Sequence, residues 1–136
     1  MRFLAFLFAV LLLAFPVRAT TLPLANVSTA GAQATATVAA VAGVTYFACG
    51  IVGVVTAGSG GASGIQTLVL RDGATGAGAI LWSIPLSAPT SGTAGYADLL
   101  SFSGTTGKAM TVEFTGGASN SAIEGVALQY KQSPCP

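Results

Sequence analysis

The side chains in this sequence that could carry out chemistry are few, and their types argue against catalysis. The chain contains no histidine, which removes both the commonest general base and the commonest metal ligand. A Ser-His-Asp or Cys-His arrangement therefore cannot form within this chain. The acidic residues are Asp72, Asp98, Glu113 and Glu124, and their spacing gives no reason to bring two of them together as a glycosidase pair requires. We predict that the protein is not an enzyme.

Metal, cofactor and phosphate sites are not indicated either. A calcium loop needs several oxygen ligands in a short segment, whereas residues 71–73 offer one acid beside a base, which is typical of a turn with a local ion pair. The glycine-rich segments 58–64 and 73–78 lack the Lys-Ser/Thr ending and the strand-to-helix context of phosphate-binding loops. We expect turns at both segments, with no metal and no cofactor.

The sequence contains two cysteines, Cys49 and Cys135. In an exported protein an even number of cysteines indicates disulfide bonding, so we predict one disulfide between them. Such a bond closes a long loop and in the chain-entropy model stabilises the fold by about 4 kcal/mol. It would fasten the C-terminal tail to the strand that holds Cys49. The alternative is a pair of free thiols.

Two aromatic residues are candidates for contacting a ligand. Sugar-binding modules present exposed Trp or Tyr rings, and Trp82 and Tyr96 could serve in this way. The alternative is that Trp82, which lies among Ile80, Ile84 and Leu86, faces the core, and this is the interpretation we favour.

The N-terminus has the pattern of a helical signal peptide. Met1 and Arg2 precede an unbroken apolar run over residues 3–15, and Val17 and Ala19 fill the small-residue positions of a cleavage site. The alternative, an uncleaved membrane anchor, would need about 20 apolar residues. We expect cleavage after Ala19, a protein exported to the extracellular space, the cell surface or a particle surface, and no stable membrane span after cleavage.

The remaining chain is almost uncharged. Removing residues 1–19 leaves three basic residues, Arg71, Lys108 and Lys131, against the four acidic ones, so the net charge is three minus four, or −1. Charged residues make up 7 % of the whole sequence, against about 25 % in ordinary soluble proteins. Without a basic patch, nucleic-acid binding is not expected. A weakly charged surface favours association with copies of the same protein or with a larger assembly.

The elements that position these residues are predicted to be strands. Short apolar or alternating segments are separated by Gly-rich turns, which indicates an all-β fold. We expect about seven strands, at residues 33–41, 44–56, 65–71, 79–86, 96–102, 110–115 and 122–131. The segment 44–56 is apolar on both faces, as expected of a central strand covered on two sides. Pro85 predicts that its strand ends there or lies at an edge, because proline has no N–H group to donate.

This pattern predicts a single β-sandwich domain over residues 33–136, either Ig-like or a jelly roll. Residues 20–32 lack a clear period and are expected to form an N-terminal arm or an added edge strand.

Four segments carry a resemblance to a known group of proteins: residues 34–43 (ATATVAAVAG), 70–78 (LRDGATGAG), 80–82 (ILW) and 110–114 (MTVEF). In these segments the chain resembles small virion-associated proteins of phages and prophages. The resemblance implies a β-sandwich that decorates or completes a particle or fibre. The signal peptide departs from that pattern, because virion proteins that assemble in the cytoplasm do not need export.

Together these observations predict a non-enzymatic, exported structural module that forms homo-oligomers or attaches to a larger assembly, such as a virion decoration, a surface sheath or a filament. The alternative is a secreted β-sandwich module that binds glycans or host surfaces.

Overall fold

The computed structural model of the protein describes residues 22–29, 31–58, 65–87, 91–115 and 122–136. The predicted signal peptide, residues 1–19, and most of the glycine-rich segment 58–64 lie outside the described residues. Among the described residues, no helix has the length and apolar character needed to cross a membrane.

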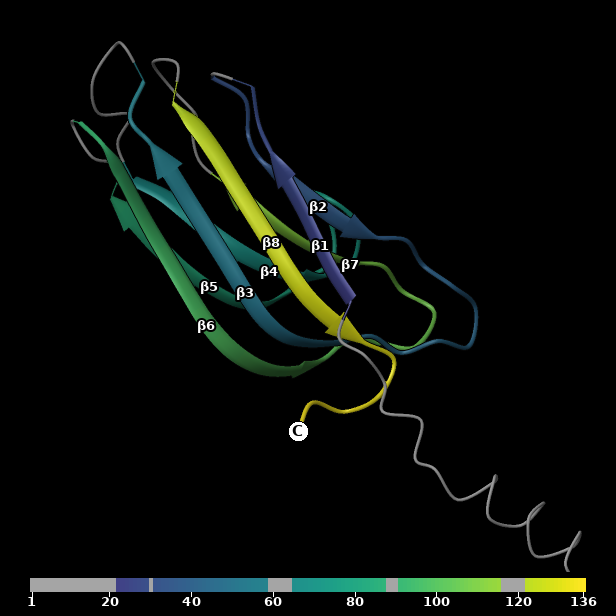
Figure 1. Ribbon diagram of the computed structural model, residues 1–136. Coiled ribbons are helices and arrows are strands. Elements are labelled where there is room, and N and C mark those ends of the chain that lie inside the picture. Colours follow the sequence, from purple (N-terminus) through teal and green to yellow (C-terminus); the bar gives the residue numbers. More distant parts are fainter. Residues whose placement is uncertain (1–21, 30, 59–64, 88–90, 116–121) are drawn as a thin grey trace, which may run out of the picture.

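The described residues form eight strands in two four-stranded sheets, which lie one behind the other (Figure 1). Sheet A has the order β1-β8-β3-β6 and sheet B the order β2-β7-β4-β5, and every neighbouring pair is antiparallel. The strands are β1 Leu22–Val27, β2 Thr35–Val38, β3 Phe47–Thr56, β4 Ile65–Asp72, β5 Ala79–Ser87, β6 Thr93–Ser103, β7 Met110–Thr115 and β8 Ile123–Lys131.

The order of the strands identifies the architecture as a jelly roll. The described strands alternate between the sheets at almost every connection, and among them only the β4–β5 hairpin stays within one sheet. Eight antiparallel strands connected in this way form two interlocking Greek keys. The prediction of an all-β sandwich is confirmed. The strand count differs because β1, in the N-terminal segment, pairs with β8 at the edge of sheet A.

The core lies between the inward faces of the two sheets. In β7, the alternate residues Met110, Val112 and Phe114 point inward. Gly53 in β3 leaves room for Leu68 and Phe114, because a Cβ atom there would lie 2.6 Å from Leu68 Cδ2 and 3.0 Å from Phe114 Cζ. The fully buried apolar side chains also include Ile51, Val55, Leu70 and Leu128.

The predicted disulfide between Cys49 and Cys135 is present, with the two Cα atoms 5.5 Å apart. Cys49 lies at a bulge, since the register of β3 against both β6 and β8 shifts between Ala48 and Gly50. A bulge sends two successive residues to the same side of a sheet. The bond therefore ties the C-terminal tail to sheet A near the point where β3 changes register.

Some strand limits differ from those predicted. The segment predicted over residues 33–41 is regular only in β2, Thr35–Val38. Residues 39–43 leave the sheet, and Gly43 has a φ of 77°. Pro85 lies in β5 at the edge of sheet B, as expected of a residue without an N–H group.

Candidate interaction face

The outward side chains of sheet A form a face whose composition follows from the strand register. Neighbouring strands place these side chains in rows that run across the sheet. The row through the middle of the face contains Ala25, Ala127, Val52 and Ala97. On one side of it lies a row that contains Gln129, Gly50 and Leu99. On the other side lies a row that contains Val27, Gly125, Val54 and Gly95. A last row contains Ile123, Thr56 and Thr93, in which the two threonine hydroxyls are 3.1 Å apart.

These rows, which we call face A, contain no charged residue among the described residues. The large apolar side chains on it are open to solvent: Leu99 is 83 % exposed, Val27 72 % and Val52 37 %. Lys131 lies beyond the bulge, opposite Phe47. Contiguous uncharged and apolar surface of this kind usually marks a site of contact with another molecule.

The central strand of face A corrects one prediction. The apolar segment 44–56 was expected to be covered on both faces, but in the structure β3 is packed only on its inner side, by Ile51 and Val55. The outer side, with Val52 and Val54, remains exposed or half-buried. The sequence of β3 is thus typical of a strand that is buried on both sides, whereas the described residues cover only its inner side.

Face A contains a shallow hollow of about 430 Å³ near the bulge. It exists because Gly50 has no side chain and Ala97 and Ala127 have only a methyl group, while Leu99 and Gln129 stand at its rim. Its lining is mainly apolar and includes one charged residue, Asp98. The hollow therefore suits an apolar side chain better than a charged or strongly polar ligand.

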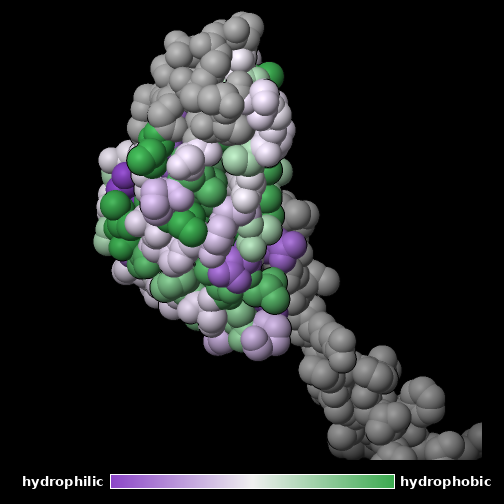
Figure 2. Space-filling model, turned by 90° about the vertical axis from the view of Figure 1, so that its left-hand side faces the viewer, coloured by the Kyte–Doolittle hydropathy of each residue, from purple (hydrophilic) through white to green (hydrophobic). Residues whose placement is uncertain are grey.

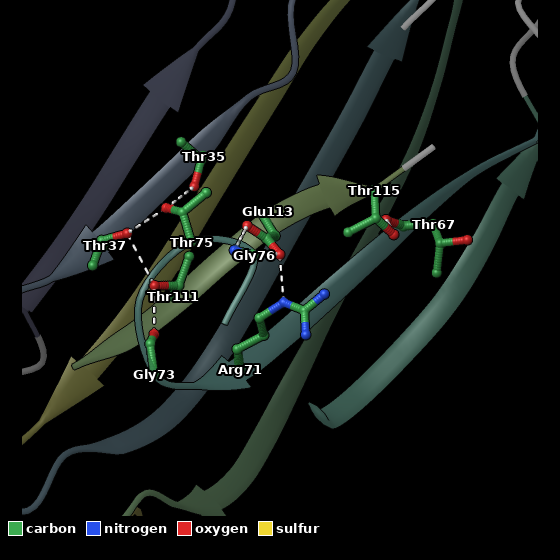
Figure 3. A network of polar contacts seen from close by, with 10 residues as sticks. All are labelled: Thr35, Thr37, Thr67, Arg71, Gly73, Thr75, Gly76, Thr111, Glu113 and Thr115. Carbon is green, nitrogen blue, oxygen red and sulfur yellow. Dashed lines mark hydrogen bonds and ion pairs between the residues drawn. The ribbon is translucent and has the colours of Figure 1, made fainter. Parts of the chain in front are cut away.

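Part of the outer face of sheet B, over β2 and β7, is polar and is covered by the chain itself, whereas Ile65 and Ile80 on β4 and β5 are 66 % and 55 % exposed. The β4–β5 connection folds over it, and Thr75 lies 3.1 Å from Thr35 and 3.3 Å from Thr37, between hydroxyl oxygens (Figure 3). Beneath the connection, Thr111 is fully buried and donates a hydrogen bond of 2.7 Å to the Gly73 carbonyl.

Glu113 lies in the same polar network and is 3 % exposed (Figure 3). It accepts hydrogen bonds from Arg71 Nε and, at 3.0 Å, from the Gly76 N–H. The predicted local ion pair between Arg71 and Asp72 is therefore wrong. Asp72 instead accepts the Thr105 N–H at 2.8 Å and faces Lys108 Nζ at 3.9 Å. This network holds the β4–β5 connection against sheet B.

The four edge strands are each protected against pairing with another strand. Pro23 in β1 and Pro85 in β5 have no N–H group to donate. Strand β2 has only four residues. In β6, the N–H of Leu99 already donates to Asp98 Oδ1 at 2.8 Å, so a carboxylate occupies part of that edge. Among the described strands, face A is thus better suited to contact than any sheet edge.

The two candidate aromatic residues meet at the open side of the sandwich, where β5 and β6 face each other. The rings of Trp82 and Tyr96 are 5.4 Å apart between centroids and tilted by 33°. Both rings are half-buried and pack against the core. The Tyr96 hydroxyl donates to Asp98 Oδ2 at 2.7 Å, which is the largest cause of the raised pKa of that tyrosine. Figure 2 views this side and shows hydrophobic and weakly polar side chains with few strongly hydrophilic ones.

The remaining acidic residue, Glu124, lies in the core and is 0 % exposed. Its Oε2 accepts the Ala34 N–H at 3.0 Å, while Oε1 has no hydrogen-bond partner. Burial raises its pKa, and the hydrogen bond from Ala34 opposes that shift. Among the described residues, no three of the His, Cys, Asp and Glu side chains are grouped as metal ligands would be.

Sequence reasoning did not identify face A, although its signal is present. The small and large residues of β3, β6 and β8 alternate in the sequence, but which small residue lies beside which large one depends on the register. The one available signal was the two-sided apolar character of residues 44–56.

No protein-family model matches the chain, and no curated protein matches it in sequence. Several solved structures are similar at low identity. One, described as "CBM4 structure and function", is 12 % identical with a TM-score of 0.40. The match covers 71 % of this chain and 61 % of that structure's chain. The PRD1 vertex protein P5 is 13 % identical with a TM-score of 0.44, covering 85 % of this chain and 99 % of its own.

A third similar structure belongs to Bacillus endospore appendages that "form a novel family of disulfide-linked pili". It is 18 % identical with a TM-score of 0.30, covering 82 % of this chain and 90 % of its own. Likenesses at these TM-scores do not transfer a function to this chain.

Proposed function

We propose that the protein is a non-enzymatic structural subunit that associates through face A, with copies of itself or within a larger assembly. The observation that carries this proposal is the central strand β3, whose outer side bears Val52 and Val54 without a cover from the described chain. Strands with apolar residues on both sides are normally buried on both sides. A partner surface supplies the missing cover.

The rest of the molecule supports this role. The β4–β5 connection covers the outer face of sheet B over β2 and β7, and the sheet edges are protected, which supports face A as the surface for contact. The disulfide fits an oxidising compartment. Together with the predicted signal peptide it supports a location outside the cytoplasm, at a cell or particle surface, where a decoration, sheath or filament would form.

Sedimentation velocity over a wide concentration range, with electron microscopy of the native material, tests the proposal. Val52→Lys places a charge at the middle of face A, and we expect it to weaken association strongly. Ile80→Lys is the matched control, because Ile80 is also exposed, at 55 %, but lies on β5 of sheet B. A wild-type protein that stays monomeric at every concentration and joins no assembly contradicts the proposal.

A glycan-binding module is the second candidate, favoured by the Trp82–Tyr96 pair. An aromatic pair beside the Asp98 carboxylate combines a stacking surface with a hydrogen-bond acceptor. Tryptophan fluorescence in a titration with oligosaccharides tests this candidate. A glycan array without signal, together with unchanged fluorescence, excludes it.

A further inference from the structure

The pattern of large and small residues on face A points to the identity of the partner, and this inference rests on the function proposed above. We propose that the partner is a second copy of this chain, docked face to face across a two-fold axis that runs along the strands between β8 and β3. Such an axis places β3 of one copy over β8 of the other, and β6 of one copy over β1 of the other. All four strands of sheet A then overlap.

The row of Val27, Gly125, Val54 and Gly95 carries the argument. From β1 to β6 the residues of this row alternate between large and small. When the row is read in the opposite direction, each large residue therefore stands opposite a small residue of the original row. The two-fold axis reverses the row. Val54 of each copy therefore lies over Gly125 of the other, and Val27 over Gly95. A surface that complements its own reverse is the requirement for an isologous dimer.

The adjoining row agrees with this arrangement, because Val52 lies over Ala127 of the other copy and Ala97 over Ala25. No valine meets a valine in either row. The space above the glycines is open, since a Cβ atom on Gly125 would meet nothing closer than 3.8 Å. The backbones can thus approach to about 10 Å, the usual distance between packed sheets.

Charge and area are compatible with a second copy. The rows of face A contain no charged residue among the described residues, and the two-fold axis places Asp98, which borders the hollow, over β1 of the other copy and not over the second Asp98. Face A is four strands wide, at about 4.8 Å per strand, and about 25 Å long, so its area is roughly 500 Å² per copy. The pair buries roughly 1,000 Å², the lower limit for a specific interface. We therefore expect a dimer that dissociates on dilution.

An exchange of large and small residues tests the arrangement in the full, disulfide-bonded protein. Gly125→Val fills the space that Val54 of the other copy would occupy, and we expect the dimer to weaken at least about 100-fold, because the overpacking occurs twice. The double variant Val54→Gly with Gly125→Val exchanges large for small at both positions, and we expect dimerisation to return. Ile80→Lys is the control that leaves it unchanged.

The outcomes separate this inference from the proposed function. Association that is insensitive to Gly125→Val, or that the double variant fails to restore, overturns the two-fold arrangement while the proposed function stands. A wild-type protein that binds only a different protein overturns it too. A wild-type protein that neither dimerises nor joins an assembly overturns both. Circular dichroism verifies that each variant is folded, and if Gly125→Val is not, Gly95→Val, which fills the space that Val27 of the other copy would occupy, replaces it and is expected to weaken the dimer in the same way.

Discussion

Removing the disulfide by the double substitution Cys49→Ala and Cys135→Ala has an effect that can be worked out from the structure. The bond joins residues separated by 86 positions. In the chain-entropy model, a loop of this length stabilises the fold by about 4.6 kcal/mol at 25 °C. Only the tail after β8, residues 132–136, is released in the folded variant. This release restores some freedom to the folded state, so we expect a net loss of about 2–4 kcal/mol.

Equilibrium unfolding in urea measures this loss. The variant should unfold at lower urea concentration and with a steeper slope, because its unfolded chain is no longer held compact by the cross-link. Wild-type protein in the presence of a reductant is the control and should match the variant. A loss below about 1 kcal/mol with an unchanged slope would refute the reasoning, because it would mean that the cross-link does not restrict the unfolded chain.

Three further predictions concern the core and the buried charges. Gly53→Ala should destabilise the fold by about 1–3 kcal/mol in thermal or urea unfolding, because the added methyl group overlaps Leu68, whereas Gly125→Ala should be nearly neutral in the monomer. Glu113→Gln should cost about 3 kcal/mol because it leaves the largely buried Arg71 without its counter-charge. Lys108→Ala should change stability by less than about 1 kcal/mol, because the Lys108 side chain is exposed, its nitrogen lies 3.9 Å from Asp72, and Asp72 keeps its hydrogen bond from the Thr105 N–H. Glu124 should make stability depend on pH: the folded protein keeps its proton at pH values where the unfolded chain has lost it, so stability falls as the pH rises from the ordinary value of 4.5 to the raised folded pKa. Urea unfolding across pH should show this fall in the wild type and a smaller one in Glu124→Gln, and equal slopes would contradict the assignment.

Much of the fold was accessible from the sequence because the alternation of apolar and polar residues directly records which side of a strand is buried. The alternate residues Met110, Val112 and Phe114 of β7, for example, all lie in the core. Pro85 was expected to end its strand or to lie at an edge, because it cannot donate to a neighbouring strand, and it lies in the edge strand β5. The disulfide followed from two cysteines and the signal pattern. These are local properties, or counts, and they do not depend on which strand lies next to which.

Only the tertiary structure decided which residues of distant strands contact one another. The pairing of Arg71 with Glu113, the burial of Glu124 and the Trp82–Tyr96 contact all join residues brought together by the jelly-roll connections. Face A is of the same kind. The glycines and valines of β3, β6 and β8 form complementary rows only through the register, which is set by long-range pairing and by the bulge at Cys49. One sequence can be threaded through many registers, and packing of the core selects the register that creates this face.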